Sequence, residues 1–178
     1  MSVYIPRIKN YAPFYIQSEE GGSAVDIQQV YGITIKAHEY PIKRKVKQPY
    51  TVERHDADGA DEWTDELWLE AFSLRLSCVI FSKNANSGSA REEIKNAVCQ
   101  FLAALRSGAL LIYDDWTKFG FQHVRLQEIP EIREGDFTEK DGRCRLIFDV
   151  VLKVNDPTTE VTLSNGELVV VDDEEEEE

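Results

Sequence analysis

The chain has 178 residues, of which 42% are hydrophobic and 30% charged, with a formal net charge of −13. This length and composition are ordinary for one soluble globular domain. No run approaches the ~20 apolar residues that a membrane-spanning helix requires. The amino terminus reaches Pro6 and charged residues before a signal-peptide apolar region could form, so we expect a protein made in the cytoplasm without a membrane partner.

The negative charge is concentrated at the carboxyl terminus. The last seven residues, 172–178, are all acidic, and without them 26 acidic against 20 basic side chains leave a charge of −6. A block of like charges is typical of a disordered, solvated tail. The remaining body is only mildly acidic, which argues against a general nucleic-acid-binding role, because such affinity comes largely from Lys and Arg.

The chain begins with mixed sequence. Residues 1–31 contain Pro6, Pro13 and the Gly21-Gly22 pair between short extended pieces, which indicates an irregular N-terminal arm. Residues 33–38 then place Ile or Ala at every second position and Thr, Lys or His at the others. This alternation predicts a half-buried strand just after Gly32.

Residues 41–69 show neither the helical nor the strand period. The segment starts with a basic run between two prolines, continues with an acidic stretch at 56–62, and ends with two tryptophans. A loop longer than ~12–15 residues inside a compact domain is usually functional or mobile. We therefore expect an extended arm at 41–69 that docks on another subunit.

A second strand and a helix follow. Apolar side chains occupy every second position from Phe72 to Ile80, which predicts a strand over 71–81. Ser89 suits an N-cap whose capping box Glu92 completes, and Gly108 suits a C-cap. These signals predict a helix at about 89–106, whose apolar stripe consists of Ile94, Val98, Phe101, Leu102 and Leu105.

The last third of the chain is rich in strand patterns. Residues 109–113 and 121–129 predict a hairpin, with a turn between them and a charged loop at 130–142 after it. The longest alternation runs over 144–154 and is expected to end at Asn155-Asp156-Pro157. Asn165-Gly166 lies between two apolar runs and predicts a two-residue hairpin turn.

These elements predict an α+β protein that is mainly β. We expect an antiparallel β-sandwich or barrel-like sheet with one amphipathic helix packed on it. The expected organisation is an N-terminal arm at 1–31, a core domain at 32–157 with the extended arm at 41–69, a hairpin at 158–171 and an acidic tail at 172–178.

The sequence contains few residues in patterns that indicate catalysis or ligand binding. His38, His55 and His123 lie in different elements, and no catalytic or phosphate-binding motif is present. The acidic stretch at 56–62 resembles part of a calcium loop. An EF-hand loop, however, has glycine at its sixth position and glutamate at its twelfth, whereas here Gly59 is fourth and Leu67 is twelfth. The three cysteines have no CxxC spacing and are expected to be core thiols. We expect no catalytic residue, cofactor or metal.

The candidate functional residues are therefore interface residues. The basic run suits an extended edge segment whose lysines discourage strand aggregation, or equally a segment that pairs with acidic surface on a neighbour. Tryptophan is enriched in interface anchors, and the alternative is that Trp63, Trp68 and Trp116 cap the core. Ile147 and Val151 make the second face of the long strand partly apolar, which favours a central strand or one covered by a neighbouring subunit. The candidates are Lys43, Arg44, Lys45, Lys47, Arg54, Trp63, Trp68, Trp116, Ile147 and Val151.

The order of strand, long arm, strand, capped helix, hairpin and long strand resembles tailed-phage tail proteins over residues 32–156. The segment from Arg54 through the Asp58-Gly59 turn to Trp63 looks like a turn of distal tail proteins, and the helix at 91–106 leads into a strand as theirs does. The resemblance implies a non-enzymatic virion subunit that forms a hexameric or similarly symmetric ring, binds other tail or neck proteins, and lets DNA pass as cargo. A tail-terminator or neck-completion protein and a monomeric adaptor domain are the alternatives.

Overall fold

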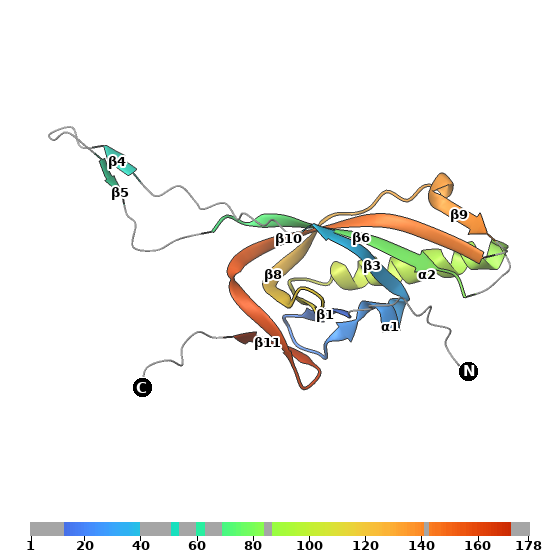
Figure 1. Cartoon of the computed structure of the whole chain (residues 1–178), viewed down its shortest axis with the longest axis horizontal. Helices are drawn as coiled ribbons and strands as arrows, with labels where there is room; N and C mark the ends of the chain where they lie inside the picture. Colours follow the sequence, from blue (N-terminus) through green and yellow to red (C-terminus); the bar gives the residue numbers. More distant parts are fainter. Residues whose placement is uncertain are drawn as a thin grey trace.

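The computed structural model describes residues 13–39, 51–53, 60–62, 69–83, 87–140 and 143–171. Strands dominate these ranges, and one long helix accompanies them (Figure 1). In chain order the elements are β1 (Phe14–Ser18), β2 (Val25–Asp26), α1 (Ile27–Tyr31), β3 (Ile33–Glu39), β4 (Thr51–Glu53), β5 (Ala60–Glu62), β6 (Phe72–Phe81), α2 (Ser87–Leu105), β7 (Leu110–Asp114), β8 (Phe119–Glu128), the 3-10 turn η1 (Glu134–Asp136), β9 (Phe137–Lys140), β10 (Arg143–Ser164) and β11 (Glu167–Val171).

One antiparallel sheet organises the domain. Its strand order is β2-β1-β7-β8-β10-β6-β3, with β9 and β11 also paired to β10, while β4 and β5 pair only with each other. The long β10 bends sharply in its second half, and the sheet curls with it (Figure 1). The predicted fold class is confirmed. Of its two forms the barrel-like one applies, since the strands that enclose the core belong to one curled sheet.

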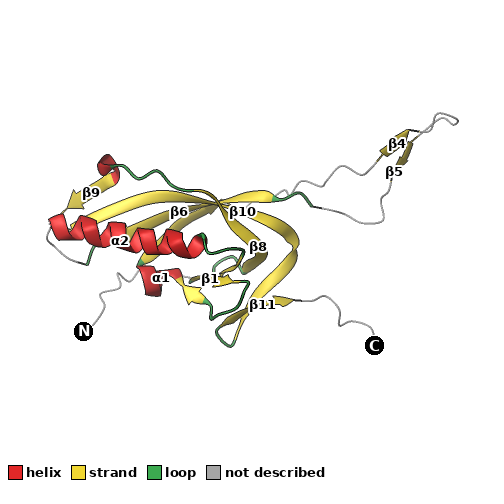
Figure 2. Ribbon diagram, turned by 180° about the vertical axis from the view of Figure 1, so that it is seen from behind, coloured by secondary structure: helices red, strands yellow, loops and turns green. Residues whose placement is uncertain are grey.

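The helix α2 covers the inner face of this sheet (Figure 2). The predicted stripe is confirmed, with Ile94, Val98, Phe101 and Leu105 at most 2% exposed and Leu102 partly buried against the same core. Burying each such side chain contributes about 1.5–3 kcal/mol relative to exposure. Among the described residues, no helix is both long and apolar enough to cross a bilayer. The inner positions of β10 that meet the helix layer are Cys144, Leu146, Phe148, Val150, Leu152 and Val154.

Residues 14–31 differ from the irregular arm expected there. The strand β1 pairs with β7 along its whole length, and Phe14 and Ile16 lie in the main core. Asp26 then caps α1 by accepting the backbone N–H of Gln28, and Gly32 ends the helix in the left-handed conformation. The glycines and prolines therefore punctuate packed elements at 14–31 and do not mark a separate arm.

Two element boundaries also differ from expectation. The helix α2 begins at Ser87, so Ser89 lies inside it and is not the N-cap. The strand β10 does not end at Asn155 but continues to Ser164 through Pro157. The register against β8 shifts between Asp156 and Glu160, and a proline without an N–H is tolerated at such a bulge. The Asn165-Gly166 turn is confirmed, with positive φ at both residues.

The thiols divide into two classes. Cys78 and Cys144 are buried as expected, whereas Cys99 is exposed on α2, one residue outside the apolar stripe. Burial raises the pKa of the Cys78 thiol to about 12, and it also raises the pKa of Cys144. Because the thiolate is the reactive form, the buried thiols resist alkylation.

We expect one thiol to react with a soluble disulfide reagent near neutral pH in the native chain, and all three after denaturation. Titration of thiols with and without denaturant measures both numbers. The Cys99→Ser variant is the control, and a native Cys99→Ser chain that still releases one rapid equivalent would contradict the burial of Cys78 and Cys144.

Candidate interaction surface

The structure describes three of the ten predicted interface residues. Lys43, Arg44, Lys45, Lys47, Arg54, Trp63 and Trp68 lie outside the described residues, as do the acidic tail at 172–178 and most of the arm at 41–69. Trp116 lies in the turn between β7 and β8, whereas Ile147 and Val151 lie on β10. The structure therefore places these three in two different parts of the domain.

Ile147 and Val151 belong to the face of the sheet opposite α2, here called the outer sheet face. Ile147 is 37% exposed and lies opposite Val79 of β6, and Val151 lies half-buried opposite Arg75. Phe81, on the same side of β6, is 46% exposed. The alternation of β6 also places Val79 and Phe81 on the outer sheet face, but they were not among the interface residues predicted from the sequence. Ile147, Val79 and Phe81 are neighbours in this register and form an apolar strip on the outer sheet face, whereas Asp149 and Ser77 separate Val151 from them.

Trp116 is presented by an ordered turn. The buried Asp114 carboxylate accepts the backbone N–H of Trp116 at 3.1 Å and the Thr117 hydroxyl at 2.7 Å. Lys118 then forms an ion pair with Asp115, so turn chemistry accounts for both carboxylates. The indole is 61% exposed and the neighbouring Phe119 is 45% exposed. Aromatic side chains on a fixed turn are suited to anchor a protein interface.

The Trp116 turn and the apolar strip lie at opposite ends of β8. Trp116 precedes the first residue of the strand, whereas the strip lies beyond the last residue, Glu128, which pairs with Val151. The ten residues of β8 are a path of roughly 33 Å measured along the strand. One partner of ordinary size therefore does not need to touch both, and the two patches suit two neighbours.

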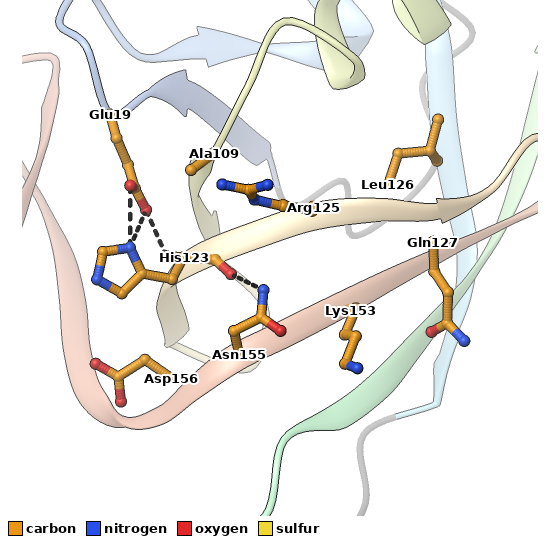
Figure 3. A pocket seen from close by; sticks show the side chains of 9 residues that line it. All are labelled: Glu19, Ala109, His123, Arg125, Leu126, Gln127, Lys153, Asn155 and Asp156. Carbon is orange, nitrogen blue, oxygen red and sulfur yellow. Dashed lines mark hydrogen bonds and ion pairs between the residues drawn. The ribbon is translucent and has the colours of Figure 1, made fainter.

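A hollow of about 720 Å³ opens on the outer sheet face beside β8 and β10 (Figure 3). Glu19 accepts the backbone N–H of His123, and its carboxylate lies 3.0 Å from the ring Nδ1. Asn155 donates to the His123 carbonyl at 3.0 Å. His123 has φ +54°, at the point where β8 bulges against β7. The hollow is lined by Glu19, Ala109, His123, Arg125, Leu126, Gln127, Lys153, Asn155 and Asp156.

The chemistry of the hollow is that of a polar binding surface. The His123–Glu19 pair has no hydroxyl or thiol nucleophile beside it among the lining residues. In the described part of the chain, no three His, Cys, Asp or Glu side chains gather as metal ligands. The hollow does contain two cationic side chains, Arg125 and Lys153, which the sequence reading did not single out.

Asp156 fixes the bend of β10 at the margin of the hollow. Burial alone would raise its pKa, but hydrogen bonds from Thr158, Thr159 and Gln122 outweigh that effect and hold the pKa well below its usual range. The carboxylate accepts both threonine hydroxyls at 2.6 Å and the Gln122 amide at 2.8 Å. Asp156 thus joins the bulge of β10 to β8.

Asp156→Asn is expected to lower the free energy of unfolding near neutral pH by about 1–2 kcal/mol, because charge-assisted hydrogen bonds are lost. A carboxyl group with a lowered folded-state pKa contributes stability above its unfolded pKa, and loses it as the pH falls toward the folded value. Denaturant unfolding near neutral pH and near pH 3 should show the difference shrinking in acid. Asp149→Asn, at an exposed ion pair 3.8 Å from Arg75, is the control and should cost little at either pH. An equal loss at both pH values would contradict the prediction.

Comparisons with known proteins find a likeness in structure alone. No protein-family model matches the chain, and no curated protein matches it by sequence. Among solved structures it is similar to the Dit protein (gp 19.1) of phage SPP1, described as a paradigm of the hub adsorption apparatus in phages that infect Gram-positive bacteria. The TM-score is 0.50 at 10% identity, with 84% of this chain and 52% of that chain covered. The chain thus spans about half the length of that protein, and the likeness shows a shared fold.

Proposed function

We propose that this chain is a non-enzymatic structural protein of a phage or phage-like tail, and that it assembles as a ring-forming subunit. The observation that carries the proposal is the fold shared with a phage hub protein over 84% of the chain. The order of elements in the sequence pointed to the same class of protein independently of that comparison. The location would then be the tail of the virion.

The surface of the domain supports self-assembly. Within the described residues β3 pairs only with β6, so no described strand covers its other edge, and such edges are templates for pairing with another chain. The apolar strip and the Trp116 turn lie far apart. A head-to-tail ring requires two different contact surfaces on each subunit, one for each neighbour. These two patches meet that requirement.

The finer assignment is a distal-tail, baseplate-hub or tube-type ring, hexameric or similarly symmetric, that binds other tail proteins and through which DNA passes as cargo. A body charge of −6 without the acidic tail suits a lumen that DNA must slide through without sticking. The alternatives are a tail-terminator or neck-completion protein and a monomeric adaptor. The effect of deleting residues 43–68, within the arm at 41–69, distinguishes an adaptor from a ring subunit.

Size-exclusion chromatography with light scattering tests the proposal. A ring subunit is expected to show a mass of several copies that grows with concentration, alone or with neighbouring tail proteins, and deletion of residues 43–68 should abolish it. An adaptor would stay monomeric and lose a partner on the same deletion. A strict monomer at high concentration that forms no ring with neighbouring tail proteins would overturn the proposal.

A further inference from the structure

The C-terminal hairpin, residues 158–171, packs as a separate unit on the body of the domain. It consists of the end of β10 and of β11, which pair with each other along the whole of β11. Its packed apolar side chains do not join the main core. They belong to a second, smaller cluster, which consists of Val161 and Leu168 of the hairpin and Leu111 and Tyr113 of β7. The hairpin is thus held together by its own strand pairing and attached to the body through one face.

The second face of β7, here called the seat, is what the hairpin covers. All five residues of β7 are buried. Leu110 and Ile112 lie in the main core, whereas Leu111 and Tyr113, at the alternate positions, lie in the smaller cluster. An empty seat would expose these two large apolar side chains to water, which is unfavourable. Every copy of the chain therefore needs a hairpin on its seat.

Two further hydrogen bonds fasten the hairpin to the N-terminal elements. The Gln17 side chain accepts the backbone N–H of Leu168 at 2.6 Å. Ala24 donates its backbone N–H to the Gly166 carbonyl at 3.0 Å. Like the apolar contacts of the seat, these bonds require only that a hairpin lies there. They do not depend on which chain supplies it.

The hairpin reaches the seat of its own chain only through the bend of β10. No loop precedes the hairpin, because β10 is one strand of 22 residues. The bend, which Figure 1 shows, lies where the register against β8 shifts between Asp156 and Glu160, and residues 156–159 are here called the hinge. The Asp156 carboxylate accepts the hydroxyls of Thr158 and Thr159 and so holds the hinge bent. A β10 that ran straight through the hinge would carry the hairpin away from its own β7.

We propose that copies of this chain exchange the hairpin, so that β10 straightens at the hinge and the hairpin of one copy occupies the seat of another. The two copies have the same sequence, and the exchanged contact therefore reproduces the smaller cluster and both fastening hydrogen bonds. Exchange gives up only the bend, and a short hinge under strain favours the exchange of an element between copies. This inference goes beyond the proposed function and does not depend on ring formation.

A photoreactive phenylalanine derivative in place of Gln17 tests which chain supplies the hairpin. Because this position contacts β11, irradiation should link it covalently to the hairpin that lies beside it. Nitrogen-15-labelled and unlabelled full chains are unfolded together, refolded at high concentration and irradiated. Exchange predicts linked peptides that combine both labels, and a band of twice the mass of one chain on a denaturing gel. A chain that keeps its own hairpin gives linked peptides of one label only.

Two variants of the hinge sharpen the test. Removing Thr158 and Thr159 shortens the hinge and takes away the hydroxyls that hold it bent, so the fraction of mixed-label links should rise at least tenfold above that of the parent chain. Inserting Gly-Ser-Gly after Pro157 lengthens the hinge, so the links should stay within one chain. The seat and both strands of the hairpin are the same in the two variants, and circular dichroism checks that each one folds.

Single-label links in both the parent chain and the shortened variant would overturn the proposal. Equal mixed fractions in the shortened and lengthened variants would also overturn it, because the hinge would then have no influence. If the shortened variant did not fold, the same comparison between the parent and the lengthened variant decides. A parent chain that assembles with single-label links would keep the proposed ring and lose the exchange. Mixed-label links that persist in Ile147→Lys would support exchange without the ring contact.

Discussion

Replacing Gly120 with alanine is expected to lower the free energy of unfolding by about 3 kcal/mol, the upper part of the range for overpacking a core. A Cβ at this position would lie 2.0 Å from the Val161 carbonyl oxygen and 2.7 Å from its carbonyl carbon. Both groups are backbone, so neither can move aside by changing a rotamer. The second half of β10 would have to separate from β8.

The displaced segment carries the smaller core of the domain. Val161 and Leu168 pack there against Leu111 and Tyr113. Moving β10 away from β8 therefore opens this cluster as well as the strand pairing. Thermal unfolding followed by circular dichroism should show a midpoint lowered by roughly 6–12 °C, since about 1 kcal/mol corresponds to 2–4 °C in a chain of this size.

Gly135→Ala is the matched control, because an added Cβ there has no atom within 4 Å. That variant should unfold within a degree or two of the parent chain. If Gly120→Ala were as stable as Gly135→Ala, the close approach of β8 and β10 at the bend would be wrong. The comparison isolates the bend from any general effect of replacing glycine.

The sequence predicted the elements whose pattern has a local cause. The inner face of β10 and the stripe of α2 follow from the two periods of 2.0 and 3.6 residues, which need no knowledge of the partner element. The continuation of β10 past Pro157 had no such local signal. It depends on Asp156, whose carboxylate ties the bulge to Gln122 of a distant strand. Likewise β1 forms because β7, far along the chain, pairs with it.

The residues of the candidate surface also differ in whether a local sequence pattern reveals them. The exposed second face at Ile147 and Val151 was visible in a single strand, and so was a tryptophan in a turn. The two cationic side chains of the hollow were not, because Arg125 and Lys153 belong to two strands and become neighbours only through their register. Charges that lie far apart in the sequence can therefore be neighbours in the fold.

Ile147→Lys is expected to weaken self-association at least tenfold while leaving the monomer folded. Ile147 is 37% exposed at the centre of the apolar strip, where a neighbouring copy in the proposed ring would complete its burial. The change removes apolar area from every contact and adds an ammonium group that would be desolvated there. A tenfold loss corresponds to about 1.4 kcal/mol for each contact, which one partly exposed isoleucine and one buried charge readily supply.

Val169→Lys is the control for this substitution. Val169 is an exposed strand residue, 45% accessible, on β11 and away from the strip, so it carries the same change of charge and a similar loss of strand propensity. Sedimentation velocity over a range of concentrations measures both variants against the parent chain. Equal weakening by the two variants would mean that charge alone, and not the strip, controls assembly. If Ile147→Lys associated as strongly as the parent chain, the outer sheet face would not take part in the ring contact. The Trp116 turn and the outer edge of β3 would then remain as the candidate contacts.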